Sequence, residues 1–276
     1  MTRLCISVDV EGDLPGVLRD GLMRGVEEGL PKLLSIFNQV HLKADFFFLA
    51  PIANENAELV ARIAKAGHGI GNHGLDHRLL CAKSLEKQRG EIMESTRILE
   101  RVCASRPTMF RAPNFSANNH TVRILQGLGY SIDSSVLPGR YLNRFGILRV
   151  YDHRGAPQEP HRPLREGGGQ EGLSVLEVPV TENPLQPGTP IGLGALNRLG
   201  PTRLIQFLET TALDTVVFLA HPWEAIDILA AYPSAPDDYG KVCSGDVGSL
   251  RTFLEAARSI AEFSTLDQVA DVFRGG

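Results

Sequence analysis

The stretch GHGIGNHGLDH, residues 67–77, reads as the end of a buried strand followed by two histidines four residues apart. His73 stands at the end of the expected strand 68–73, and His77 lies just beyond it. Two histidines at positions i and i+4 of a helical turn can point at one metal ion. The alternative is an ordinary pair of surface or helix-capping histidines. Their position beyond a buried strand favours the metal site.

Short apolar runs alternate with amphipathic helical patterns along most of the chain. Repeated strand–helix units imply a parallel sheet covered by helices, either as a barrel or as a doubly wound sheet. No G-x-G-x-x-G motif follows the first strand, so a dinucleotide-binding fold lacks its usual mark. The expected strands are 4–10, 44–50, 68–73, 108–113, 130–135, 146–152, 173–180 and 215–220, and the expected helices are 26–39, 56–67, one from the cap Ser84 to about Cys103, 121–129, 201–213, 248–261 and one from Leu266.

Two Gly- and Pro-rich stretches, 153–172 and 181–200, interrupt this rhythm. Such composition predicts loops, and long loops on a rigid scaffold usually carry specificity. We interpret both as mobile insertions that border a substrate site rather than as linkers. The whole chain, 1–276, is therefore expected to form a single domain.

The composition of the 276 residues is that of an ordinary globular protein, with a net charge of -4. No basic stripe indicates nucleic acid as a partner. The apolar run before Asp9 is too short for a signal peptide, and no run approaches the ~18 residues that span a bilayer. We therefore expect a cytoplasmic protein without a transmembrane segment. The four cysteines form no C-x-x-C pair, which argues against a thiolate metal site. Nothing indicates the oligomeric state.

Polar side chains follow the carboxyl ends of several expected strands. In a parallel α/β fold these ends meet at one edge of the sheet, where chemistry gathers. The residues are Asp9, Glu11 and Asp13 after the first strand, Arg111 and Asn114 after 108–113, Asp133 near the end of 130–135, and His221 and Trp223 after 215–220.

Asp9 and Glu11 alternate along one strand, so both side chains can face the same way. Two buried carboxylates without a partner would be costly, and a metal ion held by His73 and His77 would supply that partner. Asp13 lies beyond Gly12, where we expect the chain to turn, but it remains a rival to Glu11 as the third ligand.

The other strand-end residues each have an ordinary structural explanation. Arg111 could form a structural ion pair, and His221 could be a core histidine bonded to the backbone. Trp223, the single tryptophan, could be a core residue. Asp133 could either form a turn or orient a catalytic group.

Taken together, these segments resemble five motifs of the polysaccharide deacetylase superfamily, also described as the NodB-homology or carbohydrate esterase family 4 fold. The motifs stand in the family's order and span most of the chain. The matching segments are SVDVEGD (7–13), NHGLDH (72–77), FRAPNFS (110–116), IDSSV (132–136) and FLAHPWE (218–224).

The resemblance implies a distorted (β/α)7 barrel. The two strands at 146–152 and 173–180 are expected to form a β-hairpin inserted into it, with long loops at the barrel mouth. It implies Glu11, His73 and His77 as the metal ligands and Asp9 as the catalytic base. Arg111 would hold Asp9, and His221 would be the general acid.

Asp133 is added to the catalytic group, and Asn114 and Trp223 are assigned to substrate binding, with the backbone N–H near Asn114 helping to bind an oxyanion. This sequence departs from the commonest family pattern at two positions. Val10 stands where a second aspartate is usual, and Asn114 replaces a frequent aromatic residue.

The implied activity is metal-dependent hydrolysis of an amide. Two histidines and one carboxylate suit zinc best, although cobalt, nickel or manganese would fit. The expected reaction removes an acetyl or formyl group from an amino sugar or a similar small-molecule, glycan or lipid-linked substrate. The alternatives are an allantoinase-like hydrolase of cyclic amides or ureides, and a catalytically inactive carbohydrate-binding barrel.

Overall fold

The structure, a computed structural model, describes residues 1–144, 148–163 and 173–274. Its main feature is one parallel sheet with the order β10-β1-β2-β3-β4-β5-β8, in which β9 also pairs with β1. The strands are β1 Thr2–Val10, β2 Asp45–Phe48, β3 Gly69–Asn72, β4 Met109–Phe110, β5 Ile132–Asp133, β8 Leu176–Glu177, β9 Thr215–Ala220 and β10 Ala261–Ser264.

The sheet curls into a distorted barrel, and the gap between β8 and β9 is bridged by irregular chain. Thr181 donates its backbone N–H to Val217 O at 3.2 Å, and Leu219 donates to Ile191 O at 3.0 Å. Gly192 lies so close to β9 that a Cβ atom would stand 2.2 Å from Leu219 O, which explains the need for glycine. The expected barrel is therefore confirmed.

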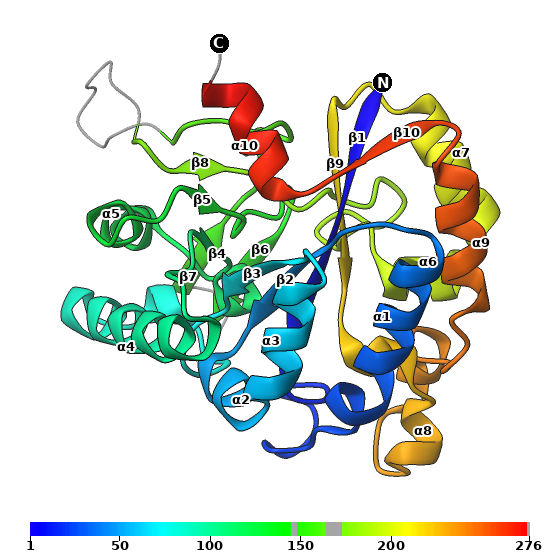
Figure 1. Ribbon diagram of the computed structural model, residues 1–276, viewed down its shortest axis with the longest axis horizontal. Helices are drawn as coiled ribbons and strands as arrows, with labels where there is room; N and C mark the ends of the chain where they lie inside the picture. Colours follow the sequence, from blue (N-terminus) through cyan, green and yellow to red (C-terminus); the bar gives the residue numbers. More distant parts are fainter. Residues whose placement is uncertain (145–147, 164–172, 275–276) are drawn as a thin grey trace.

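Helices cover the outside of the sheet, with α1 and α3 beside β1 and β2, and α7 and α9 beside β9 and β10 (Figure 1). The longer helices are α1 Leu30–Gln39, α2 Ala50–Glu55, α3 Ala57–Lys65, α4 Leu85–Cys103, α5 Asn119–Gly127, α6 Leu193–Leu199, α7 Pro201–Thr210, α8 Ile228–Ala231, α9 Gly248–Ala257 and α10 Leu266–Arg274. Shorter helical turns are η1 Gly25–Gly29, η2 Leu80–Ala82, η3 Pro113–Phe115, η4 Pro222–Ala225 and η5 Asp237–Lys241.

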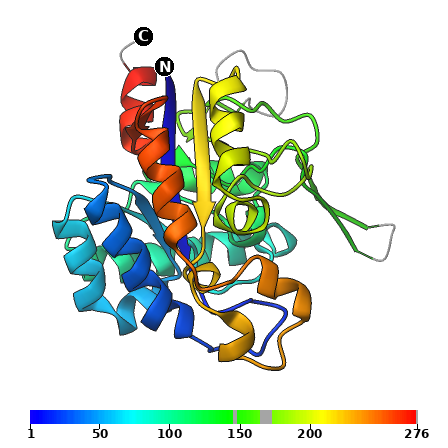
Figure 2. The same ribbon diagram turned by 90° about the vertical axis from the view of Figure 1, so that its right-hand side faces the viewer.

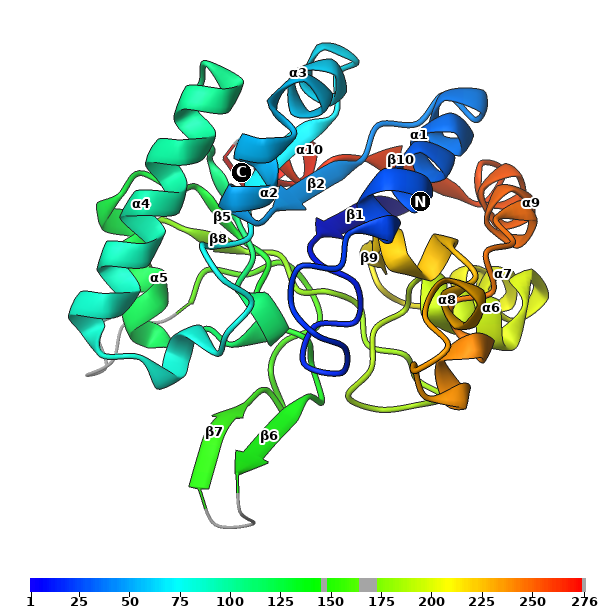
Figure 3. The ribbon, with the colours of Figure 1, turned by 90° about the horizontal axis from the view of Figure 1, so that it is seen from below.

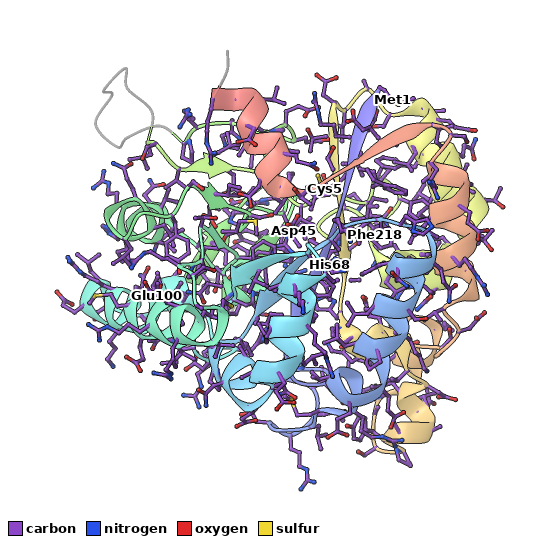
Figure 4. All side chains as sticks on the ribbon, viewed as in Figure 1. Met1, Cys5, Asp45, His68, Glu100 and Phe218 are labelled. Carbon is purple, nitrogen blue, oxygen red and sulfur yellow. The ribbon has the colours of Figure 1, made fainter. Side chains whose placement is uncertain are left out.

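Alternation along the strands decides which side chains enter the barrel. In β1, Leu4, Ile6 and Val8 pack outward with the helices, whereas Cys5 packs with Phe47 inside the barrel. Ser7, Asp9 and Glu11 share the inward direction of Cys5. Figure 4 shows Cys5 and Asp45 within the dense interior of the molecule.

The strands after the barrel's first half differ from the expected pattern in their partners. Residues 173–180 contribute β8, which pairs in parallel with β5. The inserted hairpin is instead formed by β6 Tyr141–Arg144 and β7 Leu148–Asp152, which pair antiparallel. The hairpin projects from the body of the molecule (Figure 2). Residues 146 and 147, expected to begin a strand, lie outside the described part.

Two further expectations about local structure were wrong. The helix expected over 248–261 ends at Ala257, and residues 261–264 form β10 beside β1. The stretch 181–200, expected to be rich in loops and without a helix of its own, contains α6, whose Leu193 and Leu196 are buried. Burial of these leucines against the helical layer stabilises the helix. The neighbouring Gly and Pro residues make the same segment look like a loop in the sequence.

In the described part of the chain, the structure contains no helix of sufficient length and apolar character to cross a bilayer.

Candidate active site

Polar side chains converge at the carboxyl ends of the parallel strands, which Figure 3 views end-on with the loop after β1 in the middle. They line a cleft of about 250 Å³. Its walls include Asp9, Glu11, Leu14, His73, His77, Asn114, Phe115, Arg140, Leu219, His221, Trp223 and Tyr239.

Glu11, His73 and His77 form a compact group whose potential ligand atoms all lie within 4.8 Å of one another. Glu11 Oε2 lies 2.6 Å from His77 Nε2 and 3.3 Å from His73 Nε2. His73 donates its Nδ1–H to the backbone oxygen of Arg111 at 2.8 Å, which leaves the Nε2 lone pair facing the carboxylate. This donor set and tautomer fit a divalent metal ion.

Asp13, the rival carboxylate, is turned away from the histidines. Its two oxygens accept the N–H of Gly25 at 2.9 and 3.1 Å, and Oδ2 also accepts the hydroxyl of Tyr232 at 2.7 Å. A Cβ on Gly25 would lie 2.5 Å from the Asp13 carboxylate and 2.6 Å from Trp223 N, so only glycine fits there. Glu11 is therefore the carboxylate that lies beside the histidine pair.

Asp9 and Arg111 form a buried ion pair, with Arg111 Nη1 2.7 Å from Asp9 Oδ1. Arg111 is fully buried, and it donates three further hydrogen bonds, to Ser7 Oγ and to the backbone oxygen and Oγ of Ser134. Because Oδ1 is held by Arg111, Oδ2 of Asp9 is free to face the histidines, and it lies 3.9 Å from His73 Nε2.

The histidines around Glu11 favour the ionised form of its carboxylate. Burial alone would raise its pKa, but the charges of His77 and His221 and the hydrogen bonds from the histidines hold the pKa of Glu11 well below its usual range.

His221 lies across the cleft and contacts two carboxylates. Its Nε2 is 3.7 Å from Glu11 Oε1, and its Nδ1 is 3.3 Å from Glu224 Oε2. The second contact is an ion pair without the alignment of a good hydrogen bond. Burial would lower the pKa of His221, but Glu224 and Glu11 outweigh that effect and raise the pKa to about 9. Glu224 also accepts the backbone N–H of His221 at 2.8 Å.

Glu224 was not identified from the sequence as a site residue. The only sequence signal was its i+3 spacing from His221, which becomes meaningful once the η4 turn brings the carboxylate back to the imidazole.

Trp223 both contacts His221 and supports Glu11. Its ring stacks on the His221 ring with centroids 4.6 Å apart and an angle of 20° between the planes. Its indole N–H donates to Glu11 Oε1 at 3.2 Å. Trp223 lines the cleft as expected, but it also orients a carboxylate, which the sequence did not indicate.

Asn114 and Phe115 both adopt left-handed backbone conformations, with φ of 54° and 57°. Such geometry is unfavourable for residues with side chains and often marks functional sites. Within the described residues, no acceptor takes the backbone N–H of Asn114. The Asn114 side-chain amide lies 3.3 Å from His77 Nδ1, and its backbone oxygen accepts the Tyr151 hydroxyl at 2.8 Å.

Asp133 does not join this group, contrary to its expected catalytic role. It points to the outer side of the barrel, beside Glu177 of the neighbouring strand. In the described part, no hydrogen bond or ion pair connects Asp133 to His221 or to Arg111. Burial raises the pKa of Asp133 to about 6, and burial together with the Asp133 charge raises the pKa of Glu177 well above its usual range. The strand alternation that sends Ser134 inward turns Asp133 outward.

The two expected loop segments lie at different parts of this face. Pro190 of 181–200 lines the cleft beside His221. Residues 153–163 line a separate groove with Asp133 and Glu177, and 164–172 lie outside the described residues.

Comparison with known proteins agrees with this architecture. Residues 20–132 match the family model described as polysaccharide deacetylase. A peptidoglycan deacetylase of Helicobacter pylori is 29% identical over 125 residues, covering 45% of this chain and 42% of that protein. A peptidoglycan-N-acetylglucosamine deacetylase of Bacillus cereus is 36% identical over 86 residues, covering 31% of each chain. The chain thus spans less than half the length of these curated relatives.

Solved structures extend the likeness over the whole fold. A protein assigned as a polysaccharide deacetylase from Mycobacterium smegmatis superposes with a TM-score of 0.69 at 20% identity, covering 99% of this chain and 90% of that one. The PuuE allantoinase superposes with a TM-score of 0.64 at 13% identity, covering 98% of this chain and 90% of that one. A pseudoenzyme of carbohydrate esterase family 4 from Bacillus anthracis superposes with a TM-score of 0.55 at 13% identity, covering 98% of this chain and 65% of that one.

The family match and the fold indicate the class of protein that this chain resembles. Residues 20–132 are similar to the polysaccharide deacetylase family, and the fold is that of the solved polysaccharide deacetylase structure.

Proposed function

We propose that this chain is a metal-dependent hydrolase that removes an acetyl or formyl group from the nitrogen of an amino sugar or a similar amine. The observation that carries the proposal is the convergence of three groups in one cleft: a Glu–His–His cluster, the buried pair Asp9–Arg111, and the pair His221–Glu224. Each group supplies one requirement of amide hydrolysis.

Glu11, His73 and His77 would hold a divalent ion, and zinc suits this donor set best. When bound, such an ion polarises a carbonyl group and lowers the pKa of water. The tautomer of His73 supports this assignment, because its Nδ1–H is already donated to a backbone oxygen.

Asp9 is the proposed base. Arg111 Nη1 lies 2.7 Å from Oδ1 and thereby fixes the direction of the carboxylate. Oδ2 can then accept the proton of the attacking water. The backbone N–H of Asn114 donates to the oxygen that becomes negatively charged when the carbonyl carbon is attacked.

His221 is the proposed acid. An amide nitrogen leaves poorly as an anion, so a proton must reach it as the carbon–nitrogen bond breaks. His221 Nε2 faces the cleft, while Glu224 lies 3.3 Å from Nδ1 and stabilises the imidazolium form.

A second candidate is hydrolysis of a cyclic amide or ureide. The cleft, with a volume of about 250 Å³, can accommodate a small ring as well as a single sugar unit. The same acid and base would open the ring. An inactive carbohydrate-binding barrel is less well supported, because the proposed base Asp9 and the proposed acid His221 both line the cleft, and Arg111 contacts Asp9 from behind it.

The test is a substrate panel incubated with zinc-loaded protein. Acetate or formate release is measured for N-acetyl and N-formyl amino sugars, and ring opening is measured for allantoin and cyclic imides. Asp9→Asn is the matched control, expected to lose at least ~100-fold in turnover while keeping its metal. Ring opening alone would select the second candidate. No turnover of any compound by fully metal-loaded protein would contradict both and leave the binding barrel.

A further inference from the structure

Arg140 places a guanidinium group in the wall of the cleft, and none of the roles above uses it. It lies just before β6, at the base of the inserted hairpin, and its side chain is half-buried. Nε donates to the Tyr151 hydroxyl at 3.2 Å, and Nη1 donates to Gly188 O at 3.2 Å. The guanidinium carbon lies 5.7 Å from the centre of the Phe115 ring.

These contacts fix the direction of the side chain but leave its charge unmatched. Both hydrogen-bond partners are neutral oxygens, and within the described residues Arg140 forms no ion pair with a carboxylate. Arg111, by contrast, is neutralised by Asp9 at 2.7 Å. Of the five N–H donors of a guanidinium, two are used by these contacts, so three have no partner among the described residues, and Arg140 lines the cleft.

A half-buried guanidinium with unused donors, held from both sides beside a reaction centre, is well suited to recognise an anion. Its planar fork matches the two oxygens of a carboxylate and can form two parallel hydrogen bonds. Phe115 adjoins Asn114, so an anion bound by Arg140 would lie near the group proposed to contact the reacting carbonyl.

We propose that Arg140 binds a carboxylate on the substrate, so that the preferred substrates are N-acyl amines that also carry a carboxylate group. This inference rests on the proposed function for its catalytic consequence, although the binding itself does not require turnover.

The experiment compares N-acetylmuramic acid with its primary carboxamide, which differ in one negative charge. Their dissociation constants are measured by calorimetry with zinc-loaded protein, and kcat/KM is measured by acetate release. The wild-type chain should bind the acid at least ~10-fold more tightly than the carboxamide, as expected for a bidentate charged pair. Arg140→Gln should lose that preference and keep its affinity for the carboxamide. Arg140→Lys should retain part of the preference.

Arg154→Gln is the matched control, because it removes the same charge next to the hairpin. Arg154 is exposed and already pairs with Asp152 at 2.7 Å, so its loss should leave the preference unchanged. Melting temperatures verify that each variant folds.

Equal binding of acid and carboxamide by the wild-type chain would overturn the proposal, and so would no measurable binding of either. If folded Arg140→Gln lost the same factor of affinity for the acid and for the carboxamide, Arg140 would be a structural residue rather than a carboxylate-binding one. Binding preference for the acid without acetate release from any compound would instead count against the proposed function alone.

Discussion

The indole N–H of Trp223 donates a hydrogen bond to Oε1 of Glu11 over 3.2 Å. The other oxygen of the same carboxylate, Oε2, faces His73 and His77. The hydrogen bond from Trp223 thus fixes the rotation of the Glu11 carboxylate, so that its Oε2 is directed at the histidine pair. Groups that orient metal ligands in this way usually affect metal affinity almost as strongly as the ligands.

Replacing Trp223 with phenylalanine should weaken metal binding while keeping the ring that stacks on His221. We expect apparent zinc affinity to fall by roughly 10- to 100-fold, measured by competition with a chelator. Tyr232→Phe, which removes a hydroxyl bonded to Asp13 instead of Glu11, is the control and should bind zinc like the wild-type chain. An unchanged affinity in Trp223→Phe would show that the hydrogen bond does not orient a ligand.

Changes at His221 and Glu224 should depend on the leaving group. His221→Ala should slow amide hydrolysis by at least ~100-fold, because the departing nitrogen must be protonated. An activated aryl acetate, whose phenolate leaves without a proton, should be affected much less. Glu224→Gln should show the same selectivity to a smaller degree, because the imidazolium loses its nearby carboxylate. Equal slowing of amide and ester by His221→Ala would make His221 a structural or binding residue.

The pair Asp9–Arg111 should be strongly coupled in stability. Both side chains are buried, so removing one partner leaves an uncompensated charge, at a cost of roughly 3–5 kcal/mol in the free energy of unfolding. The double variant Asp9→Asn, Arg111→Met should lose less than the sum of the single changes. Urea unfolding of the four metal-free proteins measures the coupling. Additive losses would indicate that the two charges do not stabilise each other.

The titration of Asp45 should lower the free energy of unfolding as the pH rises. It is fully buried on β2, and its Oδ1 has no hydrogen-bond partner in the described part of the chain (Figure 4). Burial raises the pKa of Asp45 to about 7. The folded state therefore holds a proton that the unfolded state has lost above about pH 4, so this contribution declines between about pH 4 and 7.

Asp45→Asn removes that titration. Its free energy of unfolding relative to wild type should therefore be more favourable at pH 8 than at pH 5, as measured by urea unfolding. Asp20→Asn, at an exposed position, is the control and should show no such difference. The same relative stability of Asp45→Asn at both pH values would contradict a buried, protonated Asp45.

The sequence predicted the parts of the fold that depend on local pattern. The apolar runs at 4–10 and 215–220 became β1 and β9, and Ser84 caps α4 as expected. It did not predict β10, because residues 261–264 form a strand only where β1 offers an edge. Nor did it predict that 173–180 would join the main sheet, because pairing with β5 is a long-range contact.

For the site, the sequence identified residues by position at strand ends, and most of these do converge. It could not show which carboxylate lies beside the histidines, since that depends on a long-range hydrogen bond in which the Gly25 N–H donates to Asp13 and turns it away. Arg140 stands in a turn without a motif, so only the fold brings it to the cleft. The single-domain extent and the cytoplasmic location remain predictions.

Restoration of activity by metal tests the central claim most directly. Protein stripped with a chelator is titrated with zinc while acetate or formate release is followed on the best compound of the panel. We expect no turnover without metal and full recovery at about one equivalent, with no recovery in His77→Ala. Full activity in the stripped protein, verified free of metal by elemental analysis, would contradict a metal-dependent amide hydrolase built on Glu11, His73 and His77.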